Sequence, residues 1–171
     1  MPEIIRARNC IVFHKGDTLT VAIDDAMAAG GWPGGQGVMW KDSSQDEFLA
    51  TYSDGRGAGF LIWGSDEDAD QFTALTRNQP TYRFAVMIFG NSLISTSSFE
   101  QYTYASRIAG PPFVPLVYGP NDPLYFSLRG LWTKEDEATL SGKPYAPLSP
   151  VGIVAQIPKP SNNNFLGIQT L

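Results

Sequence analysis

The stretch LYFSLRGLWTKEDEATLSG, residues 124–142, decides the fold that we expect for this chain. Residues 124–126 form a strand-like run, and the turn 128–130 leads into Leu131-Trp132. Two more strand-like runs follow, VGIVAQI at 151–157 and FLGI at 165–168. None of these runs is long enough to be stable alone, so we expect them to pair in a sheet with strands from elsewhere in the chain.

The composition also favours strands over long helices. The chain has 171 residues, enough for one domain with a substantial core, and it contains 17 glycines and 13 prolines, which indicate many turns. Only 17% of the residues are charged. We therefore predict a single mainly β domain over residues 1–171, a small β-barrel or β-sandwich with one or two short helices and an N-terminal arm at about residues 1–9.

Short β-rich runs separated by turn residues occupy much of the chain. Residues 14–17 resemble a hairpin turn between the first two runs. Gly57 and Gly59 lie in a pattern that lacks the third glycine of a dinucleotide-binding loop, so a close strand crossing explains them better. The runs upstream of residue 120 are 10–13, 18–23, 38–40, 48–52, 59–63, 82–89, 93–96 and 113–118.

Three segments carry helix signals. The clearest is 65–78, where Ser65 and Asp68 make a capping box and Phe72 lies on a narrow apolar stripe. Residues 24–29 can form one or two turns that end at a glycine. In the third segment Thr133 is followed by Asp136 at capping-box spacing.

Residues 99–107 are ambiguous between helix and strand. Ser97 followed by Glu100 permits a helix start, whereas Tyr102, Thr103 and Tyr104 favour a strand, and we expect the strand.

Charge and cysteine content exclude several classes of function. The net charge is −5 and the basic residues are dispersed, so nucleic acid is not expected as a direct partner. Cys10 is the single cysteine, which rules out an intrachain disulfide and a thiolate metal site. The first ten residues lack the apolar region of a signal peptide, and no apolar run approaches the length of a membrane span. We expect a protein that is made and assembled in a cytoplasm and has no membrane partner.

The residues that could carry catalysis are sparse. His14 is the single histidine and no nucleophile motif accompanies it, so we expect a structural or solvent-facing role. Paired carboxylates could serve a glycosidase, but any β-rich protein offers them. We therefore expect no enzyme, no cofactor and no metal. The carboxylates considered are Asp42, Asp46, Glu47, Asp54, Glu100 and Asp122.

The C-terminal third resembles the barrel half of the decoration, or cement, proteins of tailed-bacteriophage capsids. The residues that carry the resemblance are NDPLYFS-x-x-GLWT, SPVGIVAQIPKPS and FLGIQ. In the family, a Gly-Asp start precedes the first strand. Here Asn121-Asp122-Pro123 stands in that place, with Gly119 just upstream.

The resemblance implies a non-enzymatic virion protein, assembled in the host cytoplasm, that binds the major capsid protein as a homotrimer. A phage head–tail connector or tail protein is the nearest alternative. A carbohydrate-binding module or small glycosidase is the alternative from another class, and it would present exposed aromatics beside paired acids. Candidate contact residues lie in a glycine-rich loop and in proline-rich segments, where stiff loops lose little entropy on docking; they are Trp32, Pro33, Lys143, Pro144, Tyr145, Pro158 and Pro160.

Overall fold

The computed structural model describes residues 5–7, 9–24, 34–41, 49–57, 59–62 and 84–171 of the chain. Its strands form a seven-stranded sheet and a closed barrel. The sheet contains β1 (Ile5–Ala7), β2 (Cys10–His14), β8 (Leu93–Thr96), β9 (Pro123–Phe126), β10 (Trp132–Thr133), β11 (Gly152–Gln156) and β12 (Leu166–Thr170). The barrel contains β3 (Asp17–Ile23), β4 (Gly37–Trp40), β5 (Leu49–Tyr52), β6 (Gly59–Ile62) and β7 (Phe84–Phe89).

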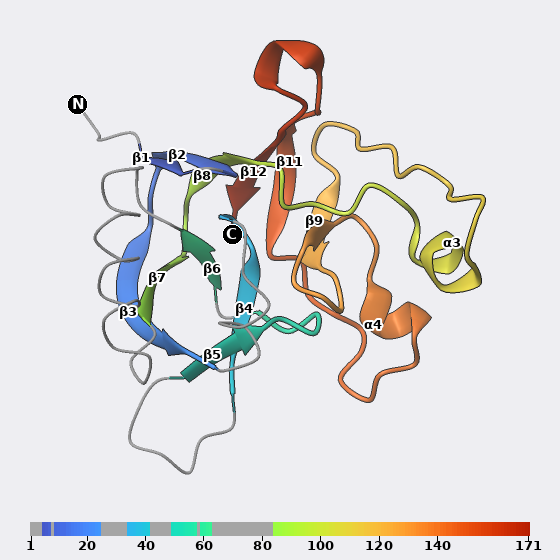
Figure 1. Ribbon diagram of the computed structural model, residues 1–171, viewed down its shortest axis with the longest axis horizontal. Helices are drawn as coiled ribbons and strands as arrows, with labels where there is room; N and C mark the ends of the chain where they lie inside the picture. The colour runs from blue at the N-terminus through green and yellow to red at the C-terminus, as the bar shows by residue number, and fades with distance from the viewer. Residues whose placement is uncertain (1–4, 8, 25–33, 42–48, 58, 63–83) are drawn as a thin grey trace.

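The strand order is β1-β2-β8-β12-β11-β9-β10 in the sheet and β3-β5-β4-β6-β7 in the barrel. Strands β3 and β5 pair in parallel, while the other pairs described are antiparallel. Two short helices, α3 (Tyr104–Ala109) and α4 (Glu137–Leu140), lie beyond β9 on the side away from the barrel (Figure 1). The prediction of a mainly β fold with short helices is confirmed.

The predicted hairpin at residues 14–17 is wrong, because this segment carries the chain out of the sheet and into the barrel. Strand β2 pairs with β1 and β8, whereas β3 pairs with β5 and β7. The chain returns from β7 to β8 beside the same place, and the Gly16 N–H donates to Ser92 Oγ at 2.8 Å. A Cβ at Gly16 would lie 2.1 Å from the Phe89 carbonyl oxygen, so the two crossings are adjacent.

The C-terminal third organises the sheet as expected. Strand β12 pairs with both β11 and β8, and β11 also pairs with β9. The predicted turn at 128–130 contacts the barrel, where the Gly37 N–H donates to the Gly130 carbonyl at 2.7 Å and Gln36 Nε2 to the Arg129 carbonyl at 3.1 Å. Sheet and barrel are therefore joined by backbone hydrogen bonds as well as by side chains.

Phe126 lies at the centre of the contact between sheet and barrel. A Cβ on Gly37 would lie 2.3 Å from one edge of its ring, and a Cβ on Gly57 would lie 2.3 Å from the other edge. The ring of Trp132 packs against Phe126 with centroids 4.5 Å apart, and its Nε1 donates to the Gly35 carbonyl at 2.7 Å. The expectation that glycines near residue 57 mark a close crossing is confirmed.

Three local expectations are wrong. Residues 104–109 form helix α3 and not a strand, because the Thr103 hydroxyl accepts a hydrogen bond from the Ser106 N–H and caps the helix. Residues 113–118 do not form a strand of the sheet, since Pro115 lacks the N–H that a ladder needs. Asp136, and not Thr133, caps α4, and it accepts from the Thr139 N–H at 3.0 Å.

Where their ends lie among the described residues, the remaining strand predictions agree with the structure to within two residues. In the predicted N-terminal arm, residues 5–7 form the edge strand β1. The predicted helix at 65–78 lies outside the described residues, as do residues 25–29 of the one or two helical turns predicted over 24–29.

We predict that Gly57→Ala destabilises the protein by about 1–3 kcal/mol, because the new methyl group overpacks the ring of Phe126. Urea unfolding should show this loss in the wild-type background and not in Phe126→Ala, where the ring is absent, since contacting residues couple in a double-mutant cycle. Gly119→Ala is the control, because its Cβ would meet no atom closer than 3.4 Å. Equal effects of Gly57→Ala in both backgrounds would contradict the packing described.

Candidate functional site: an apolar lobe on a buried ion cluster

The residues that the sequence offered for nucleophilic or metal chemistry are not assembled into a site. Cys10 is fully buried in the core, and burial raises the pKa of its thiol to about 12, although a hydrogen bond with Thr96 opposes this. His14 is exposed, because a register shift between Val12 and His14 breaks the alternation of β2. Within the described ranges, no group of three or more His, Cys, Asp or Glu side chains could hold a metal ion.

The predicted carboxylates that the structure describes are all engaged in ion pairs. Asp54 pairs with Arg56 at 2.7 Å on the surface, and Asp122 with Lys134 at 3.4 Å. Glu100 is completely buried and cannot reach a substrate. Asp42, Asp46 and Glu47 lie outside the described residues.

The predicted contact residues are dispersed over the surface. Tyr145 packs inward, donating its hydroxyl to the Asp54 carbonyl at 2.7 Å, with the Arg56 guanidinium 4.4 Å above its ring. Lys143 and Pro144 are exposed beside it. Pro160 is exposed at the start of a 3₁₀ turn, Pro160–Asn162, between β11 and β12. Trp32 and Pro33 lie outside the described residues.

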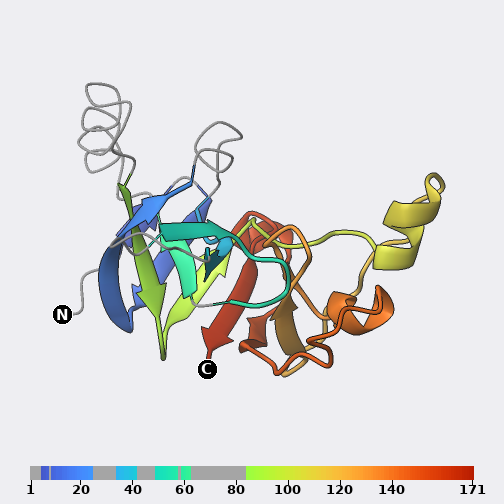
Figure 2. The ribbon, with the colours of Figure 1, turned by 90° about the horizontal axis from the view of Figure 1, so that it is seen from below.

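Within the described part of the chain, the largest group of exposed apolar side chains is one that the sequence analysis missed. Residues 102–118 leave the sheet, form α3 and return as an extended segment, which we call the lobe (Figure 2). Val117 is 75% exposed, Ile108 70% and Val114 53%. Tyr102 and Phe113 are also exposed, and their rings contact each other with centroids 5.3 Å apart. The signal was the run FVPLV at 113–117, in which a proline interrupts what resembles a strand.

Internal hydrogen bonds fix the shape of the lobe. The Thr103 N–H donates to the Val114 carbonyl at 2.8 Å, and the Leu116 N–H donates to the Gln101 carbonyl at 2.9 Å. Ser106 Oγ accepts from the Val114 N–H at 3.0 Å, which attaches the extended segment to α3. The exposed side chains are thus presented by an ordered backbone.

A buried ion cluster attaches the lobe to the body of the protein. Glu100 and Glu137 are both 0% exposed. Arg107 of α3 pairs with Glu137 and lies 3.5 Å from Glu100, while Arg129 binds Glu100 through two hydrogen bonds of 2.7 and 2.6 Å. Two buried carboxylates thus meet two guanidinium groups, that of Arg107 largely buried and that of Arg129 60% exposed, so the cluster is electrically balanced.

Further contacts support the same junction. The Tyr104 N–H donates to Glu135 Oε2 at 2.8 Å, and the Tyr118 hydroxyl donates to the Glu100 carbonyl at 2.6 Å. Tyr118 also packs edge-to-face on Phe99, with centroids 5.5 Å apart. Burial raises the pKa of the Tyr118 hydroxyl, so it remains a hydrogen-bond donor at neutral pH.

A shallow groove of about 570 Å³ lies where the lobe meets the sheet. Leu116, Val117 and Ile157 give it an apolar wall, and Gln101 and Asn164 contribute amides. Pro158, one of the predicted contact residues, also lines it. The structure thus places Pro158 next to the lobe. Because Leu116 and Val117 of the lobe line the groove, groove and lobe form one continuous surface.

Comparison with known proteins identifies no relative. No family model, curated protein or solved structure matches the chain. Among the helices in the described part of the chain, none has the length and apolar character to span a membrane.

We predict that Arg107→Ala destabilises the protein by about 3–5 kcal/mol, because removing one partner leaves a buried carboxylate without its counter-charge. Chemical denaturation measures this loss. Arg56→Ala is the matched control, since Arg56 pairs with Asp54 on the surface and its removal should change stability little. Similar small effects of the two substitutions would mean that the cluster does not attach the lobe.

The pH dependence of stability should show a contribution from Glu137. Burial raises its pKa above the ordinary value, an effect that the Arg107 guanidinium opposes only in part. A raised pKa means that the folded state binds the proton more tightly than the unfolded state, so stability falls as pH rises from about 4.3, the ordinary value, through the raised value. Glu137→Gln has no titratable group at this position. The free energy of unfolding of this variant relative to wild type should therefore rise with pH between the ordinary and the raised pKa of Glu137.

Urea unfolding at a series of pH values measures the difference between the two proteins. Should the variant instead lose stability relative to wild type as pH rises, the ion pair with Arg107 would outweigh burial, and the pKa of Glu137 would lie below its ordinary value.

Proposed function

We propose that this protein is a non-enzymatic structural protein of the virion that decorates or cements the capsid of a tailed phage. The observation that carries the proposal is the lobe, an ordered projection whose apolar side chains face solvent. Soluble proteins rarely expose contiguous apolar surface unless it binds something. The expected partner is the major capsid protein, and the expected assembly state is a homotrimer.

The charge of the lobe suits a protein partner. Between Gln101 and Tyr118 the single charged residue is Arg107, and it is turned inward to Glu137 and Glu100. The cores of protein interfaces are depleted of charge and enriched in aromatic residues, as this surface is. Tyr102 and Phe113 are the natural anchors, because a few aromatic residues usually carry most of the binding energy.

The rigid attachment of the lobe also favours binding. A surface that is already ordered loses little conformational entropy when it docks. A trimer seated at a symmetric position would gain further from multivalency, since each contact raises the effective concentration of the next. Weak individual contacts would then suffice to cement a lattice.

If the protein is instead a head–tail connector or tail protein, the lobe would bind a different partner in the same way. The carbohydrate-binding alternative needs exposed aromatics beside accessible paired acids. Glu100 and Glu137 are completely buried, so this carboxylate pair does not favour it.

We expect Phe113→Ser to weaken binding to undecorated capsids by about 2 kcal/mol, or roughly 30-fold, if the ring is a contact anchor. Co-sedimentation of purified protein with capsids measures the bound fraction. Phe13→Ser is the matched control, because Phe13 on β2 is 41% exposed and Phe113 46%, while Phe13 lies outside the lobe. The control should bind as wild type does.

The same experiment can reject the proposal. A protein that stays monomeric in light scattering, does not co-sediment and leaves the heat resistance of capsids unchanged is not a cement protein. Reproducible binding to oligosaccharides would instead favour the carbohydrate-binding alternative.

A further inference from the structure

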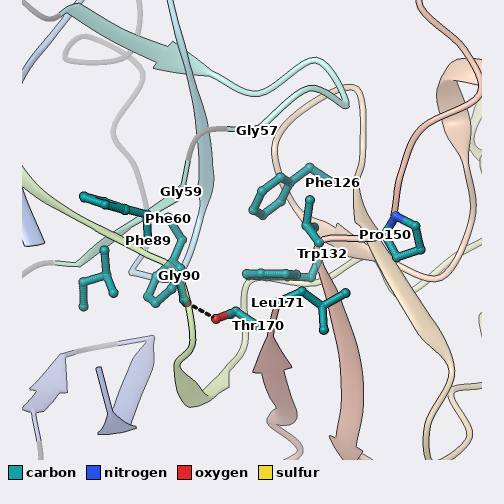
Figure 3. Close-up of a pocket in the computed structure, with 12 residues that line it drawn as sticks. Gly57, Gly59, Phe60, Phe89, Gly90, Phe126, Trp132, Pro150, Thr170 and Leu171 are labelled. Atoms are coloured by element: carbon teal, nitrogen blue, oxygen red, sulfur yellow. Dashed lines mark hydrogen bonds between the residues drawn. The ribbon is translucent and has the colours of Figure 1, made fainter. Parts of the chain in front are cut away.

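A second apolar feature lies between the sheet and the barrel, away from the lobe. It is a cleft of about 160 Å³ (Figure 3). One wall comes from the barrel side, with Phe60 on β6 and Ile88 on β7. The other wall comes from the sheet side, with Phe126, Trp132 and Val151. The proposed capsid contact does not use this space.

The floor of the cleft is buried and its rim is exposed. Phe60, Ile88, Phe126 and Trp132 are all at most 2% exposed. The rim consists of Gly57, Gly90, Pro150 and Leu171, which are exposed. A small molecule can therefore enter at the rim, with the buried aromatic rings lying beneath it.

The polar side-chain atoms at the cleft already have partners. Thr170 Oγ1 donates to the Gly90 carbonyl at 2.5 Å and accepts from the Ser92 N–H at 2.8 Å. Trp132 Nε1 donates to the Gly35 carbonyl at 2.7 Å. None of the described side chains that line the cleft is charged. The described side chains thus offer a ligand apolar contacts and no unpaired hydrogen-bonding group, so a polar group on the ligand would lose water without gaining a side-chain partner.

The volume sets the size of the ligand. In another protein, an apolar cavity of about 150 Å³ lined by aliphatic and aromatic side chains stays dry and binds benzene. We propose that the cleft between sheet and barrel is a binding pocket for one neutral aromatic ring of about the size of benzene that carries no polar substituent. Because the ring contacts both walls, its binding stabilises the packing of the sheet on the barrel.

The test uses benzene as the probe and the full chain as the protein. Benzene should raise the thermal unfolding midpoint in a saturable way, because a ligand that binds the folded state alone stabilises it. Phenol, which adds one hydroxyl group, should bind more weakly. No shift with benzene, or an equal affinity for phenol, would overturn the proposal.

A substitution places the binding in the cleft. Val151→Phe fills the space between the walls, and the shift with benzene should be lost in this variant. A shift of the same size in a folded Val151→Phe would mean that benzene binds elsewhere, and the proposal would fail. If the variant does not fold, nuclear Overhauser effects between benzene and the ring protons of Trp132 decide, and their absence at saturating benzene overturns the proposal.

The same ring can belong to a free molecule or to a phenylalanine side chain of another protein. N-acetylphenylalanine amide distinguishes the two sources, because it carries the ring on a peptide backbone. Displacement of benzene by this compound supports a pocket that accepts a side chain. Binding of benzene without such displacement supports a pocket for a small free molecule.

Discussion

The structure depends on how closely Phe126 approaches the barrel. Its ring occupies the space that side chains at Gly37 and Gly57 would need. Because Gly37 lies on β4 and Gly57 just before β6, the ring joins the C-terminal sheet to the barrel. Trp132 extends this contact, because its ring packs at a tilt against Phe126 and its Nε1 donates a hydrogen bond to the Gly35 carbonyl. Two glycines, which contribute no side chain to the core, thus determine where two strand systems meet.

The buried ion cluster solves a different problem, the attachment of an apolar projection to a small core. Burying Glu100 and Glu137 costs free energy that the two arginines offset by charge and hydrogen bonds. Such a cluster adds little net stability compared with apolar packing, but it tolerates few alternative arrangements. The lobe is consequently directed away from the body, and its exposed side chains keep one orientation. This geometry suits a binding surface better than a loop with freely varying conformation.

The low charge of the chain has a structural counterpart. Several of the described charged residues are engaged in ion pairs, and the one charged residue of the lobe, Arg107, faces inward. The side chains that line the cleft between sheet and barrel are equally neutral. The molecule thus has two uncharged apolar features, one projecting and one recessed, and both are places where we propose contacts.

The sequence by itself determined the mainly β class and most strand positions, because alternation, β-branched residues and turn residues act locally. Only the tertiary structure decided that residues 14–17 cross between two strand systems, since a turn sequence does not specify which strand its neighbour pairs with. It also decided that residues 104–109 are helical, because the Thr103 cap and the Arg107 contact with Glu137 outweigh the strand preference of the tyrosines. The lobe and the cleft could not be predicted for the same reason. Exposure depends on contacts with residues distant in sequence, and an apolar run has the same sequence pattern whether it is buried or exposed.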